Sequence, residues 1–227
     1  MFRSRSRQLE MMDDITLHDD RIAGALREIT TINRWLGGNA TSRKGIREAI
    51  RALPAGTPVT ILDVGAGGSD LSDALRPLGR AVQITSLDIS RGACEFSARR
   101  HPGASVVQGS VLQLPFRDRS FDIVHAGMFL HHFTDEALRE VLPGLFAVAR
   151  HALVVNDLRR SVFAYAGITL LTSLFSGSAM VRNDAPLSVL RGFSRREVER
   201  FATPLPGATS SVKRTWAYRW LVCIRKP

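Results

Sequence analysis

A run of ten residues, ILDVGAGGSD at 61–70, combines two acids with a cluster of glycines directly after an apolar stretch. The apolar residues predict a buried strand at 59–64, and a helical pattern follows the glycines. A strand, a tight turn and a helix in this order build a site for a nucleotide-like cofactor at the carboxyl end of the strand. Gly65 and Gly67 allow the backbone to turn there and allow a ligand to approach closely.

The acids near this turn discriminate between cofactors. A dinucleotide-binding turn carries a third glycine where this chain has Asp70, and a carboxylate there would repel a pyrophosphate. A P-loop is excluded because no Gly-Lys-Ser/Thr sequence follows. Asp63 suits a phosphate-free cofactor with a charged amino-acid end, such as S-adenosylmethionine. Asp88, at the end of the next predicted strand, is placed to accept hydrogen bonds from two ribose hydroxyls. The alternative is that Asp88 caps the following helix, in competition with Ser90.

Strands and helices alternate through the middle of the chain. The predicted strands are 59–64, 81–87, 105–108, 121–126 and 152–156, and the helices between them are 70–78, 91–100 and about 134–148. Helices at 19–36 and 42–53 precede this region. A helix at 194–201 and two β-rich runs at 209–216 and 218–224 follow it. We therefore expect an α/β, Rossmann-like, doubly wound and mostly parallel sheet, with a C-terminal antiparallel strand pair and N-terminal lid helices.

The length of 227 residues suits one domain. We expect a flexible basic tail at 1–18 and a single domain at 19–227. Within that domain we expect N-terminal helices at 19–56, a cofactor-binding core at 57–158, an apolar lid or insertion at 159–193, and a terminal helix and strand pair at 194–227.

The net charge of +10 comes mostly from scattered arginines and favours anionic partners without choosing among them. Cys94 and Cys223 lie far apart and have no CxxC companion, which predicts reduced thiols in a cytoplasmic protein. No residues are assigned to a metal, and the oligomeric state stays open.

The segment 162–181 carries no charged residue and is flanked by Arg159, Arg160 and Arg182. Its length would suit a membrane span, but its position between two strands of one sheet argues against that. We expect an apolar lid over the acceptor site that also meets a membrane surface, and hence a lipophilic acceptor. The alternative is a core helix followed by a loop.

Further motifs occur in the expected order. QGSV at 108–111 follows the third strand, LPF at 114–116 and SFD at 120–122 lead into the fourth, and LHHF at 130–133 follows it. Together with the glycine turn, this set resembles the class I S-adenosylmethionine-dependent methyltransferases. The resemblance implies S-adenosylmethionine as the cofactor, held by these residues: Asp63, Gly65, Gly67, Asp88, Ile89, Ser110 and Val111. Many relatives have an aspartate where this chain has Ser110, so its contact with adenine would be a neutral one.

The end of the first helix adds Arg34 and Trp35. In methyltransferases of this type such a helix often covers the cofactor, which would let Arg34 pair with the methionine carboxylate and Trp35 form a wall. The alternative is a solvated arginine at the end of an amphipathic helix. More loosely, residues 33–38 and 156–160 resemble small bacterial methyltransferases encoded near type III polyketide synthases.

The candidate catalytic residues are His132, His131 and Asp157. Transfer to a phenolic hydroxyl benefits from a base, and histidine suits that task near neutral pH. We expect at most one of the adjacent histidines to face the pocket and prefer His132, with Asp157 orienting a histidine or binding the acceptor. The alternatives are that both histidines are structural, as we expect for His125, and that Asp157 caps a helix or pairs with an arginine.

The expected function is O-methylation of a small hydrophobic phenol or polyketide. The alternatives are C-methylation of a quinol-type ring, a non-catalytic relative, or an RNA-directed one. A nucleic-acid acceptor is disfavoured because AGMFL at 126–130 replaces the Asn/Asp-Pro-Pro-aromatic turn that holds a flipped base.

Overall fold

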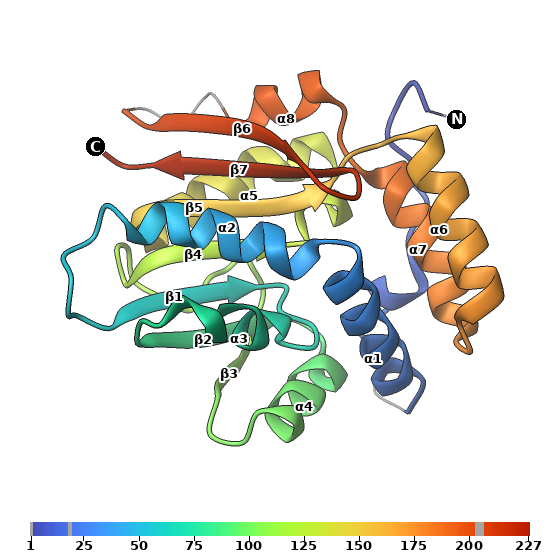
Figure 1. Ribbon diagram of the computed structural model, residues 1–227, viewed down its shortest axis with the longest axis horizontal. Coiled ribbons are helices and arrows are strands. Elements are labelled where there is room, and N and C mark those ends of the chain that lie inside the picture. Colours follow the sequence, from blue (N-terminus) through green and yellow to red (C-terminus); the bar gives the residue numbers. More distant parts are fainter. Residues whose placement is uncertain (1, 18–19, 203–206) are drawn as a thin grey trace.

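The computed structural model describes residues 2–17, 20–202 and 207–227. A seven-stranded sheet lies at its centre, in the order β3-β2-β1-β4-β5-β7-β6 (Figure 1). The strands are β1 (Val59–Val64), β2 (Val82–Asp88), β3 (Ser105–Gln108), β4 (Phe121–Gly127), β5 (Ala149–Leu158), β6 (Thr209–Thr215) and β7 (Arg219–Arg225). The first five pair in parallel, and β7 pairs antiparallel with both β5 and β6. The predicted Rossmann-like sheet with a C-terminal antiparallel pair is confirmed.

Helices cover both faces and one end of this sheet. They are α1 (Asp20–Trp35), α2 (Gly38–Ile50), α3 (Asp70–Leu75), α4 (Arg91–Arg100), α5 (Asp135–Val148), α6 (Val162–Phe175), α7 (Ala179–Arg191) and α8 (Arg195–Ala202). Short 3-10 turns occur at η1 (Met11–Asp13), η2 (Arg76–Leu78) and η3 (Leu130–His132). Ser90 and Thr134 begin α4 and α5 as N-caps, because each hydroxyl accepts a backbone N–H three residues on.

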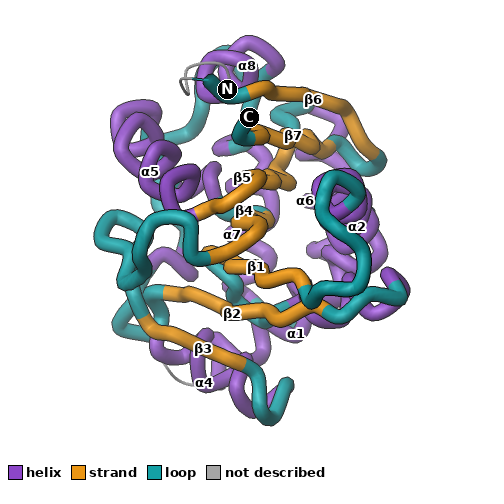
Figure 2. Tube along the Cα trace, turned by 90° about the vertical axis from the view of Figure 1, so that its left-hand side faces the viewer, coloured by secondary structure: helices purple, strands orange, loops and turns teal. Residues whose placement is uncertain are grey.

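Successive side chains of a strand point to opposite faces, and here both faces are buried. Leu62 and Val64 of β1 pack in a core with α5 and α8, whereas Ile61 packs with α2 and α3. Figure 2 shows α5 and α2 on opposite sides of the sheet. Burial on both sides explains why the central strands are almost continuously apolar.

The parallel strands end at one edge of the sheet, and α1, α6 and α7 lie beyond that edge (Figure 1). One apolar cluster joins α1, α4 and α7, and it includes Leu26, Phe96 and Val181. The cluster holds the helices together across the end of the sheet. Residues far apart in sequence are thereby brought to the carboxyl ends of β1, β2, β4 and β5.

The uncharged segment 162–181 forms α6 and the beginning of α7. Ile168 of α6 is buried, whereas Phe163, Leu170, Leu174 and Phe175 are exposed. Among the described residues, no helix combines the length and the apolar character needed to cross a membrane.

The N-terminal segment, which we expected to be a flexible tail, packs against the domain over residues 2–17. Arg5 donates to the carbonyls of His131 and Phe133 at 2.9 and 2.7 Å and pairs with Asp135 at 2.9 Å. Met11 donates its backbone N–H to Asp184 of α7. The arginine composition suggested a solvated tail, but partners more than a hundred positions away order the described part of it.

The side chain of Asp122 links the amino ends of β1, β4 and β5, so a substitution there tests how the sheet is stabilised. It accepts hydrogen bonds from the backbone N–H and hydroxyl of Thr60, both at 2.9 Å, and forms an ion pair with Arg150. Burial opposes ionisation of Asp122, but these partners lower its pKa below the usual value. Its stabilising effect is therefore present above the unfolded-state pKa and is lost as the pH falls.

We expect Asp122→Asn to lower the free energy of unfolding by about 1–3 kcal/mol near neutral pH. Urea denaturation between pH 3 and 7 should show this deficit shrinking below about pH 4, where the unfolded carboxyl becomes protonated. Asp118→Asn, at an exposed position in the preceding loop, is the matched control and should change little. A deficit of equal size at all pH values would contradict the role assigned to the charge.

Candidate active site

A cavity of about 800 Å³ lies between the sheet edge and helices α1, α6 and α7. Its lining includes the glycine turn after β1, the end of β2, the loop after β3, the turn η3 after β4, and η1 of the N-terminal segment. This volume falls within the range of small-molecule sites. One cavity therefore reaches the predicted cofactor residues other than Arg34 and both predicted catalytic histidines, whereas Asp157 lies behind its wall.

The glycine turn has the geometry that its composition predicted. Gly65 and Gly67 have φ values of 61° and 48°, a region that favours glycine. A Cβ at Gly65 would lie 2.0 Å from the ring of Phe129, so no larger residue fits there without displacing that ring. The backbone N–H of Gly67 donates to Asp88 at 2.9 Å, which holds the turn against the end of β2.

Asp88 faces the cavity and does not cap α4. Its two carboxylate oxygens accept from Gly67 and from the backbone N–H of Ser90, while the Ser90 hydroxyl caps the helix. Burial raises the pKa of Asp88 above its usual value in spite of these hydrogen bonds. Ile89, Ser110 and Val111 line the same part of the cavity. The four residues predicted around ribose and adenine are thus brought together.

Asp63 belongs to a buried hydrogen-bonded chain beneath the turn. Its carboxylate lies 2.6 Å from Nδ1 of His125, whose Nε2 lies 2.9 Å from the hydroxyl of Ser42. Asn156 donates to Ser42 and to the carbonyl of Gly38. Within the described structure, the Oδ1 atom of Asn156 is buried without a hydrogen-bond partner, and the residue lines the cavity. Sequence reasoning gave no role to either residue: Ser42 begins the predicted helix at 42–53, and Asn156 ends the predicted strand at 152–156.

The turn η3 presents both adjacent histidines to the cavity. Nδ1 of His131 lies 2.7 Å from Asp157, and Nδ1 of His132 lies 2.5 Å from Asp13. The expectation that only one ring could face the pocket is wrong, because a 3-10 turn places the two rings side by side with centroids 4.3 Å apart. Burial opposes ionisation of Asp157 and Asp13, but each paired histidine holds the carboxyl pKa below its usual value.

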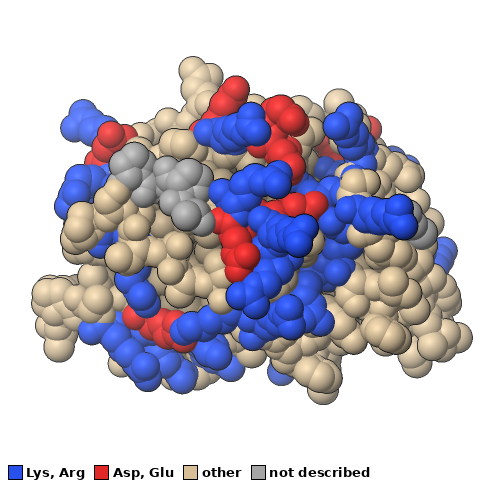
Figure 3. All heavy atoms as spheres, turned by 90° about the horizontal axis from the view of Figure 1, so that it is seen from above, with Lys and Arg blue, Asp and Glu red and all other residues tan. Residues whose placement is uncertain are grey.

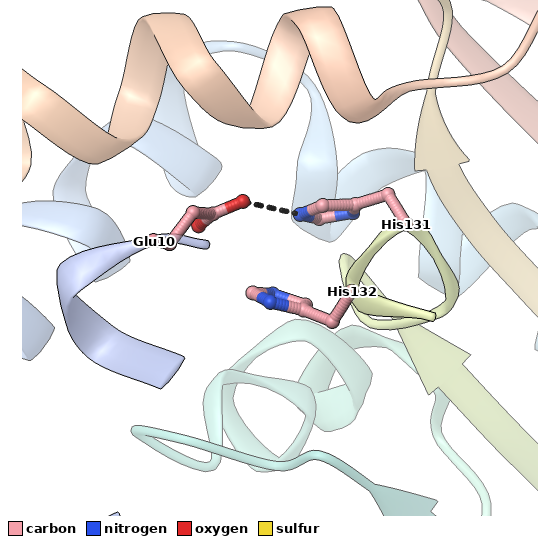
Figure 4. Close-up of side chains that lie close together, drawn as sticks. All are labelled: Glu10, His131 and His132. Carbon is pink, nitrogen blue, oxygen red and sulfur yellow. Dashed lines mark ion pairs between the residues drawn. The ribbon is translucent and has the colours of Figure 1, made fainter. Parts of the chain in front are cut away.

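Glu10 reaches the same place from the N-terminal segment. It is 7% exposed, and its Oε1 atom lies 3.6 Å from Nε2 of His131 (Figure 4). Burial raises the pKa of Glu10 to about 7. A carboxylate oxygen of Glu10 and a ring nitrogen of each histidine lie within 4.8 Å of one another, which is an arrangement that could hold a metal ion. The sequence did not predict that Glu10 lies beside the two histidines, because Glu10 is far from them along the chain.

Arg34 and Trp35 do not line the cavity. Both are exposed at the end of α1, whereas their neighbours Asn33 and Leu36 face inward. A different arginine, Arg219 of β7, is buried at the cavity and donates to the carbonyl of Leu36 at 2.9 Å and to Asn33 at 3.1 Å. Burial lowers the pKa of Arg219 to about 10. The helix period alone could not identify this residue, because it comes from the last strand of the sheet.

Known proteins share this architecture. Residues 61–152 match a family model described as a methyltransferase domain. No curated protein sequence matches the chain. The solved structure of the plantazolicin methyltransferase BpumL in complex with SAH is 14% identical, with 95% of this chain and 98% of that chain covered and a TM-score of 0.66.

Two further solved structures have the same fold. Magnesium protoporphyrin IX methyltransferase (ChlM) from Synechocystis PCC 6803, with bound SAH, is 14% identical and covers 84% of each chain, with a TM-score of 0.57. A putative S-adenosyl-L-methionine-dependent methyltransferase from Methanococcus maripaludis is 16% identical, with 89% and 92% covered and a TM-score of 0.60. Residues 61–152 therefore form a methyltransferase domain, and the chain as a whole has the fold of S-adenosylmethionine-dependent methyltransferases.

Proposed function

We propose that the protein transfers a methyl group from S-adenosylmethionine to a hydroxyl oxygen of a small lipophilic acceptor, such as a phenol or a polyketide. The observation that carries this proposal is the continuity of the cavity. The glycine turn and Asp88 line one part of it, and two carboxylate-paired imidazoles line another. Donor and acceptor can therefore meet in one enclosed space.

The cofactor half of the proposal assigns a partner to each part of the donor. Asp88 accepts from the ribose hydroxyls, and Ser110 and Val111 contact the adenine. Asp63 and Asn156 face the amino group, for which the unpartnered Oδ1 of Asn156 is a free acceptor. Arg219 takes the carboxylate-binding role that we expected of Arg34, because its guanidinium lines the cavity.

The acceptor half of the cavity is apolar. Phe163, Ile168 and Leu171 of α6 and Val189 of α7 line it. An acceptor with an apolar body would bury its surface against these side chains and gain free energy by leaving water. This lining supports a lipophilic acceptor over a charged one.

The outer surface near α6 supports delivery of such an acceptor from a membrane surface. Figure 3 shows Lys and Arg, with fewer Asp and Glu between them, over the face above β6 and α8, whereas the part over α6 is mostly uncharged. Phe163, Leu170, Leu174 and Phe175 are exposed on α6. A helix that exposes apolar side chains beside a basic face suits contact with an anionic lipid surface.

The chemistry is an in-line displacement at the sulfonium methyl group. The hydroxyl O–H bond breaks as the new O–C bond forms, and the C–S bond breaks with its electron pair passing to sulfur. We assign the departing proton to the imidazole pair, with His132 oriented by Asp13 and His131 by Asp157. A carboxylate at Nδ1 leaves Nε2 as the nitrogen that can accept a proton.

We expect Asp88→Ala to weaken binding of S-adenosylhomocysteine about tenfold or more in calorimetry, because two charge-assisted hydrogen bonds to ribose are lost. Asp88→Asn, which keeps one acceptor oxygen and the shape of the side chain, should give a smaller loss. Asp118→Asn, at an exposed loop position, should bind like the wild type. Unchanged affinity in Asp88→Ala would contradict the ribose assignment.

We expect His131→Gln and His132→Gln to reduce the rate of methyl transfer while leaving S-adenosylhomocysteine affinity unchanged. At least one variant should lose about 10²–10⁴-fold in kcat on para-alkylphenols or naphthols, with products analysed by mass spectrometry. His151→Gln is the matched control, because that side chain is 45% exposed outside the cavity. Near-wild-type rates in both variants would remove the histidines from catalysis, and a carbon-methylated product would contradict oxygen as the acceptor atom.

A further inference from the structure

Three side chains from two distant parts of the chain meet at the acceptor end of the cavity. Glu10 precedes η1 in the N-terminal segment, and His131 and His132 lie in η3 after β4. Figure 4 shows the Glu10 carboxylate extending toward the two imidazoles. One potential ligand atom from each of these residues lies within 4.8 Å of the other two.

The hydrogen bonds of the two imidazoles orient them for coordination. Asp157 lies 2.7 Å from Nδ1 of His131, and Asp13 lies 2.5 Å from Nδ1 of His132. A carboxylate at Nδ1 keeps the proton on that nitrogen and leaves a lone pair on Nε2. Metal-binding histidines characteristically have such a carboxylate on the ring nitrogen that does not bind the metal.

Among the described residues, one oxygen of the buried Glu10 carboxylate lacks a hydrogen-bond donor. Within the described structure its Oε1 atom is buried and accepts no hydrogen bond. That oxygen faces Nε2 of His131 at 3.6 Å, so two electron-pair donors point at each other. A cation between them would satisfy both, because it accepts an electron pair from each.

We propose that Glu10, His131 and His132 bind a divalent transition-metal ion, of which zinc is the favoured species. Two imidazole nitrogens and one carboxylate oxygen suit zinc and its neighbours in the first transition series, whereas magnesium and calcium prefer oxygen ligands alone. Three protein ligands leave a coordination position open toward the cavity, which is typical of a catalytic site.

One pair of ligand atoms in the cluster, from Glu10 and His131, is close to its separation in a loaded site. Ligand atoms that share one zinc ion at about 2.0–2.2 Å lie roughly 3–3.5 Å apart. The 3.6 Å separation between Glu10 and His131 nearly meets this requirement. Glu10 belongs to a segment outside the sheet, so a small movement of that segment can close the remaining gap.

The charges around the cluster favour a cation. The carboxylates of Glu10, Asp13 and Asp157 approach the two imidazoles. The guanidinium of Arg191 lies 3.8 Å from Glu10, but its shorter contact is with Asp13 at 2.6 Å. The three carboxylates therefore outnumber the arginine that pairs with them, and a divalent ion would balance the excess.

The catalytic consequence rests on the proposed function. An acceptor hydroxyl that binds at the open position would have its pKa lowered by the cation, and its proton would pass to water in the cavity. The cation would thus supply Lewis acidity to the hydroxyl oxygen that forms the new O–C bond, while the C–S bond breaks with its electron pair passing to sulfur. In the loaded site the Nε2 atoms bind the ion, so this route would replace the proton transfer to the imidazole pair that applies when no ion is bound.

The test measures metal binding directly. Full-length protein treated with a chelator and dialysed is titrated with Co²⁺, and the visible absorption is recorded before Zn²⁺ is added. We expect one Co²⁺ per chain and its displacement by Zn²⁺. Glu10→Gln and His132→Ala should each weaken Co²⁺ binding about tenfold or more, and Asp13→Asn should weaken it about 10–100-fold by releasing His132.

Matched controls separate ligation from loss of structure. Glu199→Gln and His151→Ala carry the same changes at partly exposed positions outside the cavity and should bind Co²⁺ like the wild type. Each variant is also checked for its melting temperature and for S-adenosylhomocysteine affinity. Absence of Co²⁺ binding, or equal affinity in all variants, would overturn the metal site.

The two proposals fail in different ways. Full-rate methylation of an alkylphenol by protein that binds no metal would overturn the metal site and leave the proposed function standing. Stoichiometric metal binding that depends on Glu10, without methylation of any hydroxyl acceptor, would support the site and contradict the proposed function.

Discussion

The buried pair of Asp63 and His125 is the interaction on which the cavity depends. Its 2.6 Å contact crosses between β1 and β4, and the chain of hydrogen bonds continues through Ser42 of α2 to Asn156 of β5. Burying these polar groups is tolerable only because the chain satisfies nearly all of them. The chain therefore holds the ends of three parallel strands and one helix together under the glycine turn, where the floor of the cofactor site must be rigid.

The two ends of the cavity are built by different means. The donor end relies on short-range structure, since Gly67 and Asp88 lie on consecutive strand ends and bond directly. The acceptor end relies on contacts between distant segments, in which Arg5 and Arg191 bind the carbonyls around His131 and His132. The donor end follows from a local backbone pattern, whereas the acceptor end forms only when the N-terminal segment packs against the domain. The residues of the acceptor end can therefore be substituted with less effect on cofactor binding than those of the donor end.

The positions of the glycines and acids that line one end of the cavity could be predicted because they depend on local structure. The left-handed backbone at Gly65 and the position of Asp88 after β2 follow from a strand, a turn and a helix in sequence. The expectation that Arg34 lies at the cavity was wrong, because packing of α1 against α4 and α7 decides which face of α1 meets the cavity. Arg219 was missed for a related reason, since β7 pairs antiparallel with β5 and brings that side chain opposite Leu158.

The sequence by itself determined the order of strands and helices along the core, the glycine turn and the chemical type of the methyl donor, because each depends on residues that are neighbours in the chain. Only the tertiary structure decided what surrounds the two histidines. The pairing of His132 with Asp13 and the approach of Glu10 to His131 join positions separated by more than a hundred residues. No spacing rule connects such positions. They meet because burial and ion pairing fold the N-terminal segment across the end of the sheet.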